Sequence, residues 1–113
     1  MEGMADVSGD VDVVQVAEMN RFEAWMPDGS VAGFLEYRLE GQGLFQKVLV
    51  MPHTVVNPQY EGRGVGSALV REALSWARKI GAQVDPQCSF VAAYLRRHPV
   101  YSDVWDGAGS ASE

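Results

Sequence analysis

The sequence predicts a mixed domain of the α+β or α/β class: a three-stranded antiparallel meander, a helix, a parallel fourth strand and a second, short helix. Three observations support this class. Strand-like runs in the first half are separated by short turns that contain glycine. A long segment of the second half has apolar residues at helical spacing. This helix lies between two strands, and such a connection is usually a right-handed crossover between parallel strands.

The first half of the chain contains the strands of the meander. Apolar and ring-bearing residues predict strands over residues 22–26, 31–39 and 44–56. Residues 27–30, Pro-Asp-Gly-Ser, form a turn signal, and Gly-Gln-Gly at 41–43 turns the chain again. Pro52 has no N–H to donate, so it predicts a bulge or a sheet edge in the third strand. Residues 13–16 either form a strand of their own or lead into the first one.

The long helix is predicted over residues 63–79. Its apolar positions recur three or four residues apart and form one face: Val65, Leu69, Ala73, Trp76 and Ile80. Gly81 follows as a C-terminal stop, because glycine adopts the left-handed conformation without strain.

A short strand is predicted over residues 83–85, and Pro86 ends it. A second helix is expected over residues 90–97, with Cys88 or Ser89 as its N-cap, and Pro99 ends it.

Most of the net charge of −6 comes from the two ends of the chain. Seven of the 15 acidic residues lie within the first twelve or the last eleven positions, which leaves eight acids against nine bases between them. We therefore expect a disordered acidic tail over residues 1–12, one domain over 13–105 and a flexible tail over 106–113. The domain has no basic stripe to neutralise phosphates, which argues against a nucleic-acid partner.

The cysteine count and the hydropathy pattern exclude other classes. Cys88 is the only cysteine, so the chain has no internal disulfide and no zinc site built from several cysteines. The acidic start does not resemble a signal peptide, and no apolar stretch approaches membrane-spanning length. We expect a soluble, cytoplasmic protein that binds no metal and no membrane.

A glycine-rich turn at Glu61-Gly62-Arg63-Gly64-Val65-Gly66 lies between the third strand and the long helix. Glycines let a backbone approach an anion closely, and the free N–H groups of a helix's first turn point at it. This predicts an anion cradle, although a plain tight turn has the same pattern. The glycine spacing does not fit the Rossmann fingerprint, and no Gly-Lys-Ser/Thr follows as in a P-loop.

Two further residues are candidates for chemistry. Cys88 stands at a predicted helix start, where the helix dipole favours a thiolate, so it is a candidate nucleophile or acyl acceptor. His53 precedes the cradle and is a candidate general base. The alternatives are a small buried hydrophobe for Cys88 and a structural histidine for His53. Arg63, Arg96 and Arg97 are candidate phosphate partners or, alternatively, solvated helix surface.

A series of motifs extends this reading: His53-Thr54-Val55-Val56-Asn57-Pro58, Gly62-Arg63-Gly64-Val65-Gly66-Ser67-Ala68-Leu69-Val70, Pro86-Gln87-Cys88-Ser89-Phe90-Val91 and Arg97-His98-Pro99-Val100-Tyr101. In order and spacing, the series resembles the minimal YjdJ-type branch of the GNAT N-acetyltransferases over residues 14–105. The resemblance implies a compact GNAT-like fold that binds acetyl-CoA.

The resemblance also assigns roles to residues. It implies that the coenzyme A pyrophosphate lies on backbone amides of the cradle, from Glu61 through Gly64 and Gly66 to Ser67. The pantetheine arm would pair with the main chain of the preceding strand, at Val55 and Val56. The adenine end would lie towards the second helix, where Arg96 and Arg97 help to bind it.

The sequence departs from the family pattern at three places. Glu61 replaces the usual Gln or Arg of the cradle and brings a negative charge near phosphates. Val55 stands where a carboxylate often follows His-Thr, and Tyr94 is off register for the usual tyrosine. Cys88 and His53 therefore become the predicted catalytic residues.

These residues favour an acetyl-CoA-dependent N-acetyltransferase that moves an acetyl group to an amine, either a small amine or a protein amine. A non-catalytic acyl-CoA-binding or regulatory module is the first alternative, and a plain interaction domain is the second. Either a monomer or a weak dimer is expected.

Overall fold

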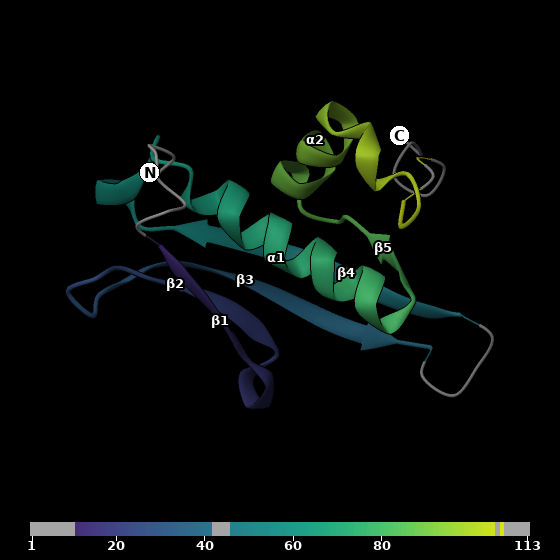
Figure 1. Cartoon of the computed structure of the whole chain (residues 1–113), viewed down its shortest axis with the longest axis horizontal. Helices are drawn as coiled ribbons and strands as arrows, with labels where there is room; N and C mark the ends of the chain where they lie inside the picture. Colours follow the sequence, from purple (N-terminus) through teal and green to yellow (C-terminus); the bar gives the residue numbers. More distant parts are fainter. Residues whose placement is uncertain (1–10, 42–45, 106, 108–113) are drawn as a thin grey trace.

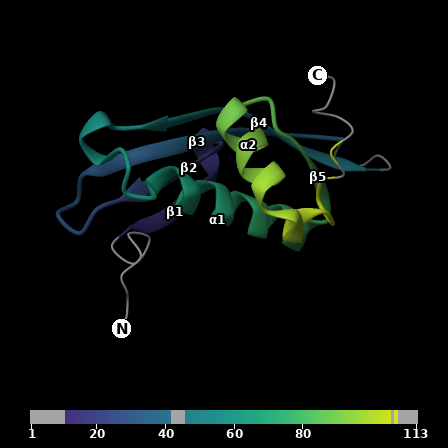
Figure 2. The same cartoon turned by 90° about the horizontal axis from the view of Figure 1, so that it is seen from above.

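Five strands form one sheet, α1 lies across one face of it, and α2 lies beside the edge of β4 (Figure 1). A computed structural model of the chain describes residues 11–41, 46–105 and 107. The view from above shows the other face of the sheet without a helix (Figure 2). The strand order is β1-β2-β3-β4-β5, so neighbours in the chain are also neighbours in the sheet. The predicted class, a compact mixed fold of α and β elements, is confirmed.

The antiparallel meander has four strands: β1 (Asp12–Val16), β2 (Arg21–Trp25), β3 (Val31–Glu40) and β4 (Lys47–Val56). Three were predicted, and the open alternative at residues 13–16 is a strand of its own. β1 also includes Asp12, which we predicted to belong to the disordered tail. Asp12 pairs with Trp25 through the main chain, and this pairing does not depend on an apolar side chain. Val11, also assigned to that tail, packs against the core, and residues 1–10 lie outside the described residues.

The crossover prediction is confirmed. Helix α1 (Val65–Ile80) connects β4 to β5 (Ala82–Asp85), and β5 pairs in parallel with Lys47–Val50 of β4. The helix starts two residues later than predicted because Gly64 has a φ of 81°, which is left-handed and not helical. At the other end Gly81 has a φ of 72° and ends the helix as expected. Among the helices of the described residues, none is long and apolar enough to cross a membrane.

The core lies between the sheet and α1. The predicted apolar positions Val65, Leu69 and Ala73 are at most 1% exposed. Trp76 is only partly buried at the edge of the core, where its ring lies 5.0 Å from that of Tyr37. The amphipathic face of α1 therefore binds the helix to the covered face of the sheet and fixes where its N-terminus lies.

A β-bulge in β4 reverses which side chains face the helices. Glu36 pairs with His53 and Arg38 pairs with Val50, so Met51 and Pro52 together lie opposite one residue of β3. Pro52 predicted this irregularity. Because side chains alternate along a strand, the extra residue shifts the alternation by one position. Before the bulge Leu49 and Met51 belong to the buried core, whereas after it Thr54 and Val56 face the helices and His53 and Val55 face the bare side.

Helix α2 (Ser89–Arg97) follows β5, with Cys88 as its N-cap residue. The segment after it folds back onto α1 and β5. Arg78 of α1 binds the Asp103 carboxylate at 2.6 and 2.9 Å, and the N–H of Val84 donates to the carbonyl of Val104 at 2.8 Å. These bonds hold the segment after α2 against α1 and β5. They fix α2 beside the end of the sheet where β4 and β5 separate (Figure 1). In the predicted C-terminal tail, residues 106 and 108–113 lie outside the described residues.

Candidate functional site

The connection between β4 and α1 forms a rigid loop. It contains a 3₁₀ helix at Pro58–Tyr60, and the Asn57 side chain caps this helix by accepting the N–H of Gln59 at 3.1 Å. Tyr60 is buried, and its hydroxyl is 3.0 Å from the Ser30 hydroxyl in the β2–β3 turn. The loop is therefore fixed to the sheet before the glycine-rich turn begins.

The glycine-rich turn brings backbone amides to the surface of a cleft. Gly62 and Gly64 have φ values of 79° and 81°, a region that favours glycine. The first hydrogen bond inside the helix runs from the Ala68 N–H to the Gly64 carbonyl, at 3.0 Å. The N–H groups of Val65, Gly66 and Ser67 precede it and have no carbonyl of their own helix to bind. This arrangement suits an anion, because the N-terminus of a helix also carries partial positive charge.

The cleft at this turn has a volume of about 310 Å³. It is lined by the end of β4, the glycine-rich turn and the start of α2: Val56, Tyr60, Glu61, Gly62, Gly64, Val65, Gly66, Ser67 and Phe90. A Cβ at Gly62 would meet no atom within 4 Å, so the turn leaves open space on this side. The predicted cradle is therefore the floor of a real cleft.

Phe90 forms the opposite wall of the cleft. A Cβ placed at Gly66 would lie 2.8 and 3.0 Å from two carbons of the Phe90 ring, so glycine lets the two helix starts approach. The ring remains 38% exposed. Phe90 was not among the predicted site residues, since only the docking of α2 on α1 brings it to the cradle.

One edge of β4 is open beside the cleft. β5 pairs only with Lys47–Val50, and the strands separate beyond that point. The N–H of Asn57 donates to Ala32 of β3 at 2.7 Å, so the main-chain groups of Val55 also face β3 and those of Thr54 and Val56 face the open edge. Of the two valines predicted to pair with pantetheine, Val56 presents its main chain to the cleft side, and Val55 does not.

Cys88 lies where β4 and β5 separate. Its N–H donates to the carbonyl of Met51 at 3.0 Å, and its sulfur is 3.6 Å from the hydroxyl oxygen of Thr54. Burial of the thiol raises its pKa, but the N–H groups of Val91, Phe90 and Thr54 and the Thr54 hydroxyl outweigh this effect. The pKa of Cys88 is therefore lower than that of an ordinary cysteine, as its position at a helix start predicts.

His53 lies on the other side of the same strand. Its side chain is exposed on the bare face, with its ring centroid 6.4 Å from that of Phe34 and with Glu36 as its cross-strand partner. Within the described part of the chain, no hydrogen bond joins His53 to Cys88. The bulge thus separates the two predicted catalytic residues: the cysteine is on the helix side of β4 and the histidine is on the bare side.

The predicted arginines are spread over two places. Arg63 lies in the cradle turn, with its guanidinium 5.7 Å from the Tyr60 ring centroid. Arg96 and Arg97 are in the last turn of α2, at the opposite end from Phe90. Tyr94 is buried and stacks on His98 with ring centroids 3.9 Å apart, so it is held within the packing of α2.

Thr54 is the main contact that sequence reasoning missed. Its neighbours Leu49 and Met51 are core residues, and counting by twos would place Thr54 on the bare face and His53 on the helix side. The predicted bulge at Pro52 was the available signal, since one extra residue reverses this assignment.

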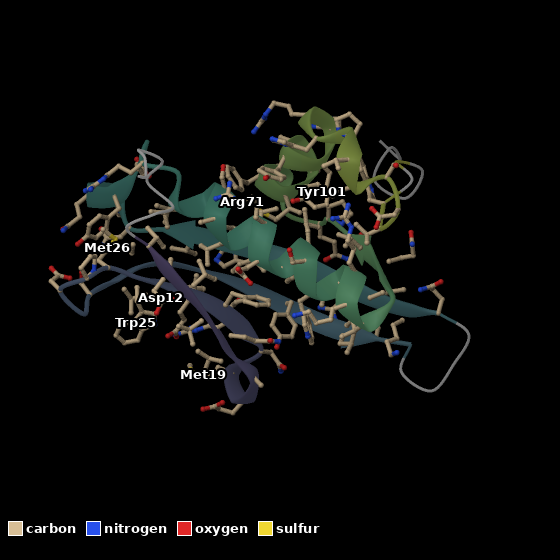
Figure 3. All side chains as sticks on the ribbon, in the orientation of Figure 1. Asp12, Met19, Trp25, Met26, Arg71 and Tyr101 are labelled. Atoms are coloured by element: carbon tan, nitrogen blue, oxygen red, sulfur yellow. The ribbon has the colours of Figure 1, made fainter. Side chains whose placement is uncertain are left out.

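A larger cleft than the one at the cradle lies elsewhere in the described part of the chain. It has a volume of about 570 Å³ and is lined by Val11, Asp12, Val14, Trp25, Met26, Pro27 and Gly29. Figure 3 shows Asp12, Trp25 and Met26 at the end of the sheet away from Tyr101. Its described lining residues include one carboxylate and no basic side chain, which does not suit a phosphate, so the smaller cleft at the cradle is the better candidate site.

A family model described as GCN5-related N-acetyl-transferase matches residues 21–104. The match includes the cradle, His53 and Cys88, and it covers well over half of the chain. The chain belongs to this family. Members of the GCN5-related N-acetyltransferases take the acetyl group from acetyl-CoA, which is therefore the acyl donor of the site. The predicted GNAT membership is confirmed, while the YjdJ-type branch stays a prediction.

Solved structures of other acetyltransferase-like proteins have the same fold. A GCN5-like candidate N-acetyltransferase from Staphylococcus aureus is 23% identical with a TM-score of 0.64, over 85% of this chain and 88% of that one. A candidate acetyltransferase from Pyrococcus furiosus is 24% identical with a TM-score of 0.55, over 69% of this chain and 56% of that one. A GCN5-related N-acetyltransferase from Kribbella flavida is 24% identical with a TM-score of 0.54, over 72% of this chain and 22% of that one.

At these identities the likeness concerns the fold alone. The chain spans most of the Staphylococcus protein but little more than half of the Pyrococcus protein and about a fifth of the Kribbella protein. Among curated proteins, none matches the sequence significantly.

Proposed function

We propose that this GCN5-related N-acetyltransferase moves the acetyl group of acetyl-CoA to an amine at the cleft between β4, α1 and α2. One observation carries the proposal: free amides at the start of α1 and a cysteine of lowered pKa lie at the two ends of one open strand edge. The amides would bind the pyrophosphate, and the strand edge would guide the pantetheine arm towards Cys88.

The cradle would bind acetyl-CoA mainly through its backbone. The N–H groups of Val65, Gly66 and Ser67 would face the pyrophosphate, and Arg63 adds positive charge to the same turn. Val56 would pair with the amide groups of pantetheine, as a strand does in β-augmentation. Arg96 and Arg97 remain proposed contacts for the adenine end, since they lie at the far end of α2.

The surroundings of Cys88 favour a covalent route over a role as proton donor. A thiolate attacks the thioester carbonyl, its sulfur–carbon bond forms, and the carbon–sulfur bond to coenzyme A breaks. The coenzyme A thiolate leaves and takes a proton from water. A free amine then attacks the acetyl-cysteine, and the cysteine thiolate is released.

His53 would act on the amine. An ammonium must lose its proton before it can attack, and an imidazole is suited to accept that proton at neutral pH. Because His53 is on the bare face, the amine would reach the acetyl group from that face, past the open edge of β4. In the alternative direct route the amine attacks acetyl-CoA itself, and Cys88 protonates the departing thiolate.

Mass spectrometry after incubation with acetyl-CoA alone tests the covalent route. We expect one added acetyl group on the wild-type protein and none on Cys88→Ala, which should also lose its acetyltransferase activity. An unmodified Cys88 together with full activity of Cys88→Ala would exclude this route and leave direct transfer.

Two departures support a second candidate, a non-catalytic acyl-CoA-binding or regulatory module. Glu61 lines the cleft and places a carboxylate near the pyrophosphate, and Val55 supplies no carboxylate on the face that carries His53. Calorimetric titration with coenzyme A, combined with an acetylation assay on small amines and on protein amines, separates the two candidates. Binding without turnover on any amine would favour the module.

The finer assignments rest on the same motifs. We propose that the domain of residues 13–105 belongs to the YjdJ-type branch, on the order and spacing of its four motifs. The acceptor is proposed to be either a small amine or a protein amine.

A further inference from the structure

We propose that Thr54 is a positioning residue for Cys88, whose hydroxyl holds the sulfur at the open edge of β4. The inference rests on the proposed function, because it specifies how the reactive thiol of that site is oriented. Nothing in the motif pattern assigns a role to Thr54, and its contact with Cys88 arises only in the folded chain.

The contact joins two elements that are far apart in the sequence. Thr54 belongs to β4 and Cys88 is the N-cap residue of α2, 34 positions later, yet their Oγ1 and Sγ atoms are 3.6 Å apart. The bulge at Met51 and Pro52 makes this possible, because it turns Thr54 to the helix side of the strand. A regular strand would point the hydroxyl to the bare face.

The main chain of Cys88 is already fixed to the same strand. Its N–H donates to the Met51 carbonyl at 3.0 Å, and its carbonyl accepts the N–H of Ala92 at 3.0 Å. These bonds hold the Cα of Cys88 beside β4 and leave the rotation of the side chain as its main freedom. The Thr54 hydroxyl selects the rotamer that keeps the sulfur against the open edge.

The hydroxyl suits both forms of the cysteine. It accepts a hydrogen bond from the thiol and, after rotation, donates one to the thiolate. The other donors near the sulfur are the N–H groups of Val91, Phe90 and Thr54, which are uncharged. The nearest titratable side chains along the chain point elsewhere, since His53 is on the bare face and Asp85 accepts the Gln87 amide at 3.2 Å. Among the hydrogen-bonding groups named around the sulfur, the Thr54 hydroxyl is the one that a side-chain substitution removes.

The test compares Thr54→Val with Thr54→Ser by alkylation of Cys88 with iodoacetamide, followed by mass spectrometry from pH 6 to pH 10. Valine has the shape of threonine without the hydroxyl, and serine keeps the hydroxyl without the methyl. The Cys88 pKa lies below its usual value, so loss of a donor to the thiolate should raise it. We expect Thr54→Val to move the alkylation profile to higher pH and to slow the reaction at pH 7 by about a factor of three to ten.

Thr54→Ser should keep the wild-type profile, and Ser75→Ala on the exposed side of α1 serves as a control for unrelated hydroxyl loss. Far-UV circular dichroism verifies that each variant is folded. A profile of Thr54→Val that coincides with the wild type would overturn the proposal. A profile of Thr54→Ser as shifted as that of Thr54→Val would also overturn it, because packing of the methyl group would then be responsible.

Alkylation requires no acetyl-CoA, so this result is independent of the proposed function. A shifted Thr54→Val profile in a protein that never acetylates Cys88 would support the positioning role and argue against the covalent route.

Discussion

Glu23 lies on the bare face of the sheet, yet it is only 7% exposed. Its carboxylate accepts hydrogen bonds from Arg21 at 2.9 Å and from the Trp25 indole at 3.0 Å. The Arg21 guanidinium also covers the Phe34 ring at 4.6 Å from its centroid. Buried carboxylates require such partners, because an unpaired charge away from water is costly.

This contact predicts that Arg21→Met destabilises the protein. Methionine keeps most of the cover over Phe34 but leaves the Glu23 carboxylate without its cation, so we expect the free energy of unfolding to fall by about 1–3 kcal/mol. Urea denaturation followed by circular dichroism measures it. Arg38→Met breaks the exposed pair with Glu40 and should leave stability unchanged within error. Equal losses in both variants would contradict the special role of Glu23.

At the scale of elements, one glycine-containing turn precedes helix α1 and another follows it, and a glycine in each has a similar left-handed φ. Gly62 in the cradle turn has a φ of 79° and Gly81 after the helix has a φ of 72°. A Cβ at either position would meet no atom within 4 Å. The two sites therefore differ mainly in location, since only Gly62 lines the cleft.

We expect Gly62→Ala and Gly81→Ala each to lower the free energy of unfolding by about 1 kcal/mol, because alanine is strained in the left-handed region. Only Gly62→Ala should weaken coenzyme A binding, since its methyl group would stand where the pyrophosphate approaches the backbone. Thermal denaturation and calorimetric titration measure the two effects. Equal affinity in both variants would mean that the pyrophosphate does not bind at this turn.

The bulge in β4 determines on which face of the sheet the side chains of His53 and Thr54 lie. Without the extra residue at Met51 and Pro52, His53 would face the helices and Thr54 would face the bare side. With it, Thr54 contacts Cys88 on one side, and His53 is exposed beside Phe34 on the other. The strand thus presents the contact to the proposed nucleophile and the proposed base to opposite faces of one sheet.

For the whole molecule, the cleft lies where three packed elements meet. Its walls come from β4, the start of α1 and the start of α2, and the strands beneath it separate after Val50. A ligand that fills the cleft would contact both sides of this separation. Ligand binding should therefore stabilise the whole domain and not only the cradle turn.

We expect coenzyme A at a free concentration of about 100 times its Kd to stabilise the fold by about 2.7 kcal/mol, which should raise the Tm by several degrees. Pantetheine lacks the pyrophosphate that the cradle would bind, so it should give a much smaller shift at the same concentration. Differential scanning calorimetry measures both. An equal shift with the two ligands would argue against the amides of α1 as the main anchor.

Much of this protein was determined by its sequence alone. The turns, the helical period of α1, the glycine stop and the parallel fifth strand follow from local spacing and from the handedness of crossovers, and short-range sterics enforce both. The glycine-rich turn at the cleft and the place of Cys88 at a helix start follow from residue types and turn signals, which are also local. Tertiary structure alone decided that Phe90 closes the cleft and that Thr54 contacts Cys88. It also decided that Val56 rather than Val55 faces the open edge and that His53 lies on the bare face. These outcomes depend on how the strands pair, where the bulge shifts that pairing and how α2 docks. Pro52 is a local signal for the bulge, whereas the pairing partners and the docking of α2 have no signature within a few residues of the chain.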